Sequence, residues 1–166
     1  MREFRGPARR RQTSNNLDVW ISRRTDYATR ALLAMALDGG GSMKLEELAR
    51  RTGAPQSVLE QVMPVLRSAG IVRSERGPAG GYRLNKTPEE ITLERVVRLF
   101  QGQLAPIGYA TRRNPDPAPK FVADSLRKSW SEVRDATIEV LERTTFADLA
   151  ERAGGSWRDD SSTEVP

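Results

Sequence analysis

Three stretches in the first half of the chain repeat apolar residues at helical spacing. The first covers residues 25–37 and ends at the glycine run 39–41. A short second stretch covers residues 44–51, and a third begins at Pro55, where the missing N–H costs a helix nothing. The inward positions of the third stretch are Leu59, Val62, Met63 and Leu66. We therefore predict three helices, with a tight turn at 52–54 between the last two.

Proline at position 64 conflicts with the third helix. It removes the hydrogen bond to the carbonyl of Glu60 and costs a helix interior on the order of 3 kcal/mol. The sequence predicts that the helix either kinks at Pro64 or ends early there. Its N-terminal turns precede the proline and are not affected.

Residues 71–85, IVRSERGPAGGYRLN, contain two short alternating runs around a tip rich in glycine and proline. This turn chemistry predicts a β-hairpin. A hairpin directly after a helix pair, with basic residues on the hairpin and polar residues on the helix, is typical of a winged helix-turn-helix that binds duplex DNA. The alternative is an ordinary surface hairpin, which its attachment to the helix pair disfavours.

More helix is predicted beyond the hairpin. Residues 87–90 combine a capping hydroxyl with proline at the first helical position, and Thr92 then caps a second short helix. Residues 102–120 hold four prolines and almost no periodicity, which predicts a long loop that is functional or mobile. A long helix at 121–143 follows, and Thr145 begins a further short one.

Within the long helix, one set of side chains is spaced alternately by four and by three residues. The set is Leu126, Trp130, Val133, Thr137, Val140 and Thr144. That spacing is the heptad seam of a coiled coil. We predict a homodimer interface along the first five members, because the winged domain already has enough helices for its core. The alternative is a helix packed on its own domain.

The predicted fold class is therefore mainly α (α+β), a winged helix-turn-helix with a long C-terminal dimerisation helix. A disordered basic extension is expected at 1–17 and the DNA-binding domain at 18–101. A loop at 102–120 leads to the dimerisation helix and a short C-terminal helix at 121–153. Residues 154–166 are polar and are expected to form a disordered tail.

Charge is concentrated at the start of the chain. Residues 1–30 carry eight arginines against three acids, whereas the remaining 136 residues carry 19 basic and 19 acidic groups. The whole excess of +5 therefore lies next to the first helix. Clustered arginine is expected where a protein contacts phosphates, and the alternative for residues 1–17 is a tail that only adds solubility.

The composition excludes several classes of site. Cysteine and histidine are absent, so the chain has no disulfides, no thiolate or imidazole metal ligands and no Cys or His nucleophile. No apolar run approaches the ~18 residues of a membrane span, and the arginine-rich start lacks the apolar stretch of a secretion signal. We expect a cytoplasmic protein without membrane contact.

The third helix is predicted to enter the major groove with its N-terminal turns. Its first polar positions are Gln56, Ser57, Glu60 and Gln61. Gln can bridge adenine, Glu can accept from the cytosine amino group, and Ser can serve either base. Glu60 has an alternative role as a solvated acid that only lowers non-specific affinity.

Arginines outside this helix are predicted to contact other parts of the duplex. Arg76 lies at the hairpin tip, which fits a minor groove, where narrow A·T tracts favour a guanidinium. Arg23, Arg24 and Arg30 are predicted phosphate contacts, which position a protein without specifying a sequence.

Several motifs together resemble one bacterial family. The segments SRRTDYATRALLAMAL, LEELARRTGAPQSVLEQVMPVLRSAGIV, RGPAGGYRL and TLERVVRLFQG resemble the Rrf family of repressors, the IscR/NsrR/CymR type, over residues 20–150. The resemblance implies a winged helix-turn-helix homodimer that regulates transcription at a palindrome. It also implies base-contacting roles for Ser57 and Glu60 on the helix and for Arg76, Gly77 and Pro78 on the wing.

The chain departs from that family in its loop. Many members hold an iron–sulfur cluster through three cysteines in the segment that corresponds to residues 102–126. Here Tyr109 and Leu126 stand where two of those cysteines are expected, so we predict no cluster and no other cofactor. Three explanations stay open: a natural cysteine-free regulator with another signal, a regulator that needs no signal, or replacement of the cysteines by engineering.

Other functions are weighed against this one. An enzyme is disfavoured, because there is no cysteine, no histidine, no Gly-rich phosphate loop and no pair of carboxylates in a plausible pocket. A DNA-independent protein-interaction adaptor is a second alternative. The main variant is a repressor that responds to a small-molecule effector, with a pocket in the 102–130 region lined by Tyr109, Phe121 and Trp130.

Overall fold

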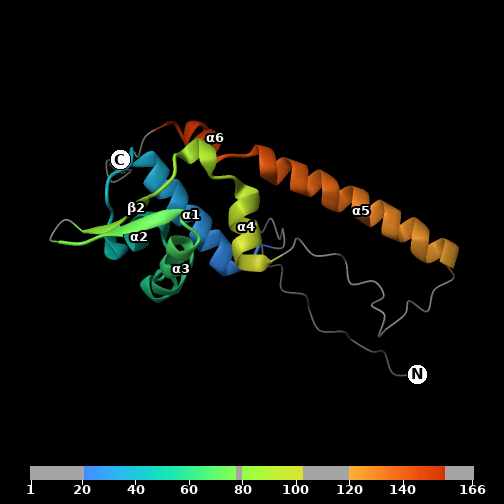
Figure 1. The fold of residues 1–166 in the computed structure, drawn as a ribbon, viewed down its shortest axis with the longest axis horizontal. Helices are drawn as coiled ribbons and strands as arrows, with labels where there is room; N and C mark the ends of the chain where they lie inside the picture. The colour runs from blue at the N-terminus through green and yellow to red at the C-terminus, as the bar shows by residue number, and fades with distance from the viewer. Residues whose placement is uncertain (1–20, 78–79, 103–119, 156–166) are drawn as a thin grey trace, which may run out of the picture.

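The computed structural model describes residues 21–77, 80–102 and 120–155. Its elements are α1 (Arg23–Leu37), α2 (Leu45–Thr52), α3 (Gln56–Ser68), β1 (Val72–Glu75), β2 (Gly81–Leu84), the 3-10 helix η1 (Pro88–Glu90), α4 (Leu93–Gln101), α5 (Lys120–Arg143) and α6 (Phe146–Arg152). The predicted fold class is confirmed: helices form the body, one antiparallel hairpin projects from it, and α5 extends away on the other side (Figure 1). Within the described ranges, no helix is long and apolar enough to cross a membrane.

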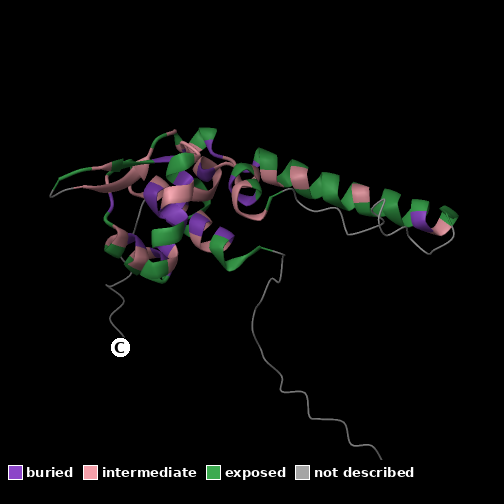
Figure 2. Cartoon of the chain, turned by 60° about the horizontal axis from the view of Figure 1, so that its bottom comes forward, coloured by how far each residue is buried: buried purple, intermediate pink, exposed green. Residues whose placement is uncertain are grey.

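A single cluster of buried side chains holds the body together. Its fully buried large members include Leu32, Met35, Leu48, Leu59, Met63, Leu66, Ile71, Ile91 and Phe146. They come from α1, α2, α3, the start of the hairpin, the segment before α4 and α6. Figure 2 shows the buried positions gathered in this body, whereas most of α5 is exposed. The inward stripe predicted for α3 is confirmed, because all four of its residues are buried.

Helix α1 begins two residues earlier than predicted, at Arg23. Ser22 is its N-cap, and the Ser22 hydroxyl accepts a hydrogen bond from the Thr25 N–H at 3.2 Å. This bond satisfies one of the N–H groups that a helix start leaves without a partner. The apolar pattern missed this turn because its residues are polar.

The third helix continues through Pro64 to Ser68, which excludes an early end, one of the two predicted alternatives. Burial of Val62, Met63 and Leu66 on both sides of the proline outweighs the missing hydrogen bond. Pro55 is the N-cap of α3 and not its first helical residue.

The hairpin pairs Val72 with Leu84 and Ser74 with Tyr82, as an antiparallel ladder. Its second strand also pairs with Met43, because Met43 N–H donates to Tyr82 O and Tyr82 N–H donates to Met43 O, both at 2.8 Å. Gly81 makes this possible. A Cβ on Gly81 would lie 2.9 Å from the Lys44 nitrogen and closer still to the carbonyl oxygen of Met43.

We expect Gly81→Ala to destabilise the protein. The added methyl meets backbone atoms, which cannot turn aside as a side chain can, so the pairing of β2 with Met43 must open. The expected loss in the free energy of unfolding is about 1–3 kcal/mol, measured by urea unfolding. Ser74→Ala, elsewhere in the hairpin, adds no atoms and should have little effect. An unchanged unfolding midpoint for Gly81→Ala would show that the strands do not approach so closely.

The C-terminal end of α5 is fixed to the body by backbone hydrogen bonds. The Leu93 N–H donates to Thr144 O, and the Phe146 N–H donates to Ile91 O, both at 2.9 Å. The predicted cap of α6 is present, since Thr145 and Asp148 form a reciprocal capping box. Thr144 is buried, and its hydroxyl donates to Val140 O, so the heptad pattern predicted to include Thr144 ends before it.

Candidate nucleic-acid interface

The N-terminal half of α3 separates buried from exposed side chains. Gln56, Ser57, Glu60 and Gln61 are all exposed, and Leu59 between them is fully buried. The Gln56 amide donates to a carboxylate oxygen of Glu60 across 3.4 Å, the spacing of one helical turn. The four polar side chains predicted to contact bases therefore share the outer surface of one helix, and two of them are linked.

A tight turn connects α2 to α3. Gly53 ends α2 with a φ of 65°, a left-handed conformation that glycine adopts without strain. The buried Thr52 hydroxyl donates to Leu48 O at 2.6 Å, and the Ala54 N–H donates to that hydroxyl at 3.2 Å. These bonds hold the turn between the two helices and thereby fix the position of the start of α3.

Arg30 lies beside this turn. Its guanidinium pairs with Asp26 at 2.8 Å, stands 5.7 Å from the centre of the Tyr27 ring and reaches Thr52 O at 3.5 Å. Its side chain is still about half exposed, at 52 %. The structure therefore places this predicted phosphate contact next to the start of α3.

Arg23 and Arg24 lie elsewhere, in the first turn of α1. They are exposed, and the Ser22 N–H before them donates to the Gln101 side chain of α4 at 3.0 Å. Figure 1 shows this end of α1 beside α4 and away from the wing. Arginine at a helix N-terminus is repelled by the positive end of the helix dipole. The two arginines and that end of the dipole together favour the binding of an anion.

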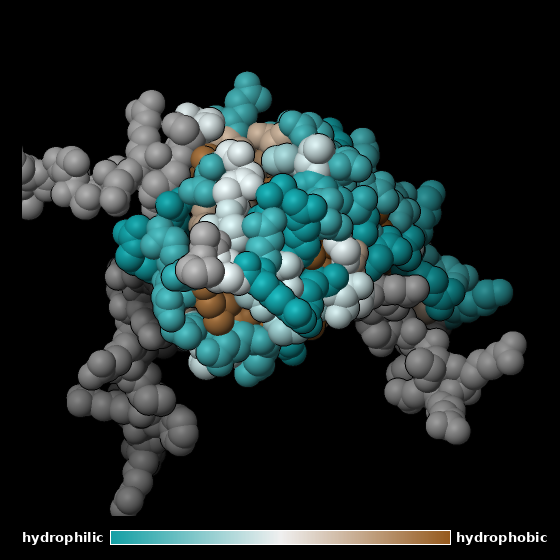
Figure 3. Space-filling view, turned by 60° about the vertical axis from the view of Figure 1, so that its left-hand side comes forward, coloured by the Kyte–Doolittle hydropathy of each residue, from teal (hydrophilic) through white to brown (hydrophobic). Residues whose placement is uncertain are grey.

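The wing projects from the body beyond α3. Arg76 is exposed at its tip, followed by Gly77 with a φ of 110°, and Pro78 lies outside the described residues. Seen from the wing side, the surface is mainly hydrophilic, with smaller apolar hollows (Figure 3). The structure thus brings Arg76 to the same end of the molecule as α3.

Sequence reasoning missed two arginines on the wing. Arg73 and Arg83 face each other across the hairpin, and both pair with Glu75, at 3.6 Å and 3.1 Å respectively. The sequence contains this pairing, because a hairpin with its tip at residues 76–80 places positions 73 and 83 opposite each other. The alternation of side chains along each strand does not show which residues pair across the hairpin, since that register depends on the length of the turn.

Ion pairs connect α2 to the end of α1. Arg51 bridges Asp38 at 2.7 Å and Glu47 of its own helix. Hydrogen bonds from Arg50 and Arg51 lower the pKa of Glu47 from 4.5 to about 2. Glu47 therefore stays ionised throughout the neutral range. Arg50 and Arg51 form ion pairs that stabilise α2 and its contact with the end of α1.

The predicted dimer seam is an exposed apolar face. Leu126 is 43 % exposed, Trp130 39 %, Val133 51 % and Val140 47 %. Thr137 is exposed beside them, with its hydroxyl bonded to Val133 O. Contiguous apolar surface on one helix is typical of an interaction site.

The residues predicted to line an effector pocket do not meet within α5. Phe121 and Trp130 are nine residues apart, about two and a half turns, and so lie on opposite faces. Tyr109 lies outside the described residues. A pocket that uses all three stays a prediction.

The donor chemistry of the chain does not fit an iron–sulfur cluster. Such clusters are bound by thiolates, with imidazole as an occasional substitute, and the whole sequence has neither cysteine nor histidine. The described residues also contain no group of three or more carboxylates arranged to hold a metal ion.

Comparison with known proteins gives concordant matches. The family model Rrf2, described as "Iron-dependent Transcriptional regulator", matches residues 21–152. The transcriptional regulator CymR of Bacillus subtilis is 32% identical over 136 residues, which cover 81% of this chain and 92% of CymR. The prediction of a regulator in place of an enzyme is thereby confirmed.

Solved structures agree with the sequence matches. The structure of CymR, the global cysteine regulator of B. subtilis, has a TM-score of 0.68 and 32% identity, and the match covers 80% of this chain and 96% of CymR. The IscR structure from T. potens has a TM-score of 0.63 and 28% identity, and the match covers 88% of this chain and 93% of the IscR chain.

Proposed function

This chain belongs to the Rrf2 family of DNA-binding transcriptional regulators, and from that premise we propose that it acts as a homodimeric repressor at a palindromic operator. One observation carries the proposal: the start of α3 presents only polar side chains outward, on a helix whose other side is fully buried. A rigid helix with that division is suited to the major groove. A regulator acts where its DNA is, so the proposed location is the cytoplasm.

Base contacts are assigned to Gln56, Ser57, Glu60 and Gln61. The link between Gln56 and Glu60 supports a joint role, because the amide and the carboxylate can each take one partner on neighbouring bases. Each good bidentate contact is worth about 1–3 kcal/mol of discrimination. The wing contributes Arg76, Gly77 and Pro78 at the minor groove.

Phosphate contacts are assigned to Arg23, Arg24 and Arg30. The position of Arg30 beside Thr52 supports a contact next to the recognition helix. Arg23 and Arg24, with the N-terminal turn of α1, support a second contact further along the backbone. Contacts of this kind fix the register of the protein on the duplex.

Self-association is assigned to α5. Its exposed seam of Leu126, Trp130, Val133, Thr137 and Val140 has the spacing of a coiled coil, and its end is fixed to the body at Thr144. A partner helix on this seam would hold two recognition helices at a constant separation. Such a dimer matches a palindrome with half-sites one helical turn, or a multiple of it, apart.

A regulator of this kind needs no cluster. Its signal is proposed to be a small molecule or absent, and residues 102–130 are the region in which we predicted an effector to act.

Two substitutions separate the roles of helix and wing. Arg76→Ala should weaken binding to the operator more than binding to random DNA, because it removes a minor-groove contact. Glu60→Ala should relax preference at one base position and raise overall affinity, since it removes a negative charge that faces phosphates. Fluorescence anisotropy with operator and scrambled duplexes measures both effects. Operator binding by Arg76→Ala equal to that of the wild type would refute the assignment of the wing tip.

A further inference from the structure

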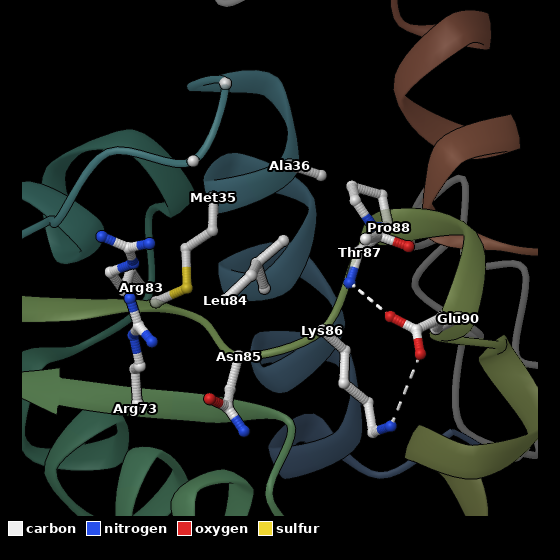
Figure 4. A pocket seen from close by; sticks show the side chains of 12 residues that line it. Met35, Ala36, Arg73, Arg83, Leu84, Asn85, Lys86, Thr87, Pro88 and Glu90 are labelled. Carbon is white, nitrogen blue, oxygen red and sulfur yellow. Dashed lines mark hydrogen bonds and ion pairs between the residues drawn. The ribbon is translucent and has the colours of Figure 1, made fainter.

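A cavity of about 480 Å³ lies between the base of the wing and the C-terminal end of α1. Met35 and Ala36 of α1, Leu84 of β2 and Pro88 of η1 supply its apolar lining, and Arg73 and Arg83 supply charge. Figure 4 shows the two arginines side by side at one end, with Met35 and Leu84 between them and the Thr87–Pro88 end. Its size is typical of sites for small molecules. The cavity contains no residue of α5, so it is separate from the predicted effector region.

The arginine end carries positive charge that its surroundings do not balance. Arg73 and Arg83 are directly opposite in the hairpin, where like charges repel, and they share one carboxylate, Glu75. In addition, the Nε of Arg83 is buried and has no hydrogen-bond partner within the described part of the chain. A buried donor without a partner is rare, and its position beside a cavity indicates an acceptor that enters from outside.

The opposite end of the cavity is already neutralised. Lys86 stands 3.8 Å from Glu90, and the same carboxylate accepts the Thr87 N–H at 2.8 Å. That N–H bond and the Lys86 charge lower the pKa of Glu90, so it stays ionised and paired. The ligand therefore needs one anionic group for the arginines and an uncharged, apolar remainder for the surface of Met35, Leu84 and Pro88.

We propose that this cavity is a binding site for a small organic carboxylate with an apolar body. The carboxylate bridges the guanidinium groups of Arg73 and Arg83, and Glu75 occupies part of that position when the ligand is absent. Because β1, β2 and α1 all contribute to the site, an occupant would restrain the base of the wing. Any effect on DNA binding rests on the proposed function, whereas binding of the carboxylate does not.

A backbone phosphate of DNA is another anion that could satisfy the same arginines. The arrangement favours the small ligand, because the cavity lies on the side where β2 packs on α1, whereas α3 packs against β1. A duplex held by α3 would have to reach around the hairpin. Binding of DNA at these arginines would therefore contradict the proposal.

Benzoate is a suitable probe, because its ring current shifts the NMR signals of nearby methyl groups. In protein labelled at the methionine methyls, benzoate should move the signal of Met35 and leave that of Met63, in α3 and away from the cavity, unchanged. Benzylamine, of the same shape but opposite charge, should move neither signal. No saturable shift of Met35 with benzoate, or an equal shift with benzylamine, would overturn the proposal.

Charge variants test the assigned contacts. Arg73→Gln and Arg83→Gln should each weaken benzoate binding by about tenfold or more, and Glu75→Gln should tighten it by about two- to fivefold. Arg127→Gln, on α5, is the matched control and should bind as the wild type does. Unchanged benzoate affinity in both arginine variants would refute the site. Loss of operator binding in those variants, with no benzoate shift in the wild type, would instead assign the arginines to DNA.

Discussion

Replacing Trp130 with aspartate is expected to convert the proposed dimer into a monomer and to weaken operator binding strongly. The side chain is one of the five residues of the exposed seam, at 39 % exposure in the single chain. In a dimer it would be desolvated, and a buried carboxylate without a partner costs several kcal/mol. A monomer engages one half-site only, so affinity for the full operator should fall by at least a factor of about 100, because the second half-site no longer binds at a high effective concentration. Light scattering and anisotropy measure the two effects.

Lys128→Gln is the matched control for this substitution. It changes the net charge by the same amount, but its position lies on the side of α5 away from the seam. It should remain a dimer and bind the operator normally. If Trp130→Asp also remained a dimer, the interface would have to lie elsewhere on the molecule.

Operator affinity is expected to fall by about 10³–10⁵ between 50 and 200 mM salt, if the dimer makes six to ten phosphate contacts. Binding of cationic side chains to phosphates releases condensed counterions, and added salt opposes that release. The slope of log affinity against log salt concentration is obtained from anisotropy titrations at four or more salt concentrations.

The same titrations test individual arginines. Replacing both Arg23 and Arg24 with alanine should reduce the slope by about one for each phosphate that a protomer no longer neutralises, with little change in sequence preference. Arg127→Ala, on α5, serves as the control and should leave the slope unchanged. A flat salt response of the wild-type protein would contradict binding through the duplex backbone.

The helices of the body could be predicted from the sequence because their apolar spacing and their caps agree. The α3 stripe, the Thr92 cap and the Thr145 cap are all present as predicted. The errors have local causes. The first turn of α1 has polar residues and therefore no apolar pattern by which to predict it. Helix α3 continues beyond Pro64 because the residues on both sides of the proline are buried in the core.

Features that depend on contacts between distant segments could not be predicted. The pairing of Tyr82 with Met43 joins residues far apart in the chain, and the need for glycine at position 81 follows from it. The cavity beside Arg73 and Arg83 likewise depends on how the end of α1 meets the hairpin. Periodicity reports which side of an element is buried, but not which element covers it.

The absence of thiolate and imidazole ligands, in contrast, follows from composition alone. The family model is described as iron-dependent, yet this chain has no thiolate or imidazole to bind a cluster. The carboxylate site proposed beside Arg73 and Arg83 would give such a chain another way to bind a signal.

The most direct test of specific DNA reading is to capture genomic fragments with the purified protein and to sequence them. We expect one enriched palindrome whose half-sites lie about 10–11 base pairs apart, or a multiple of that distance. We further expect that Glu60→Ala weakens the enrichment of the preferred base at one position in each half-site. A motif that is the same for Glu60→Ala and the wild type would contradict a base contact by Glu60, and recovery of fragments without any shared motif would contradict base recognition by α3.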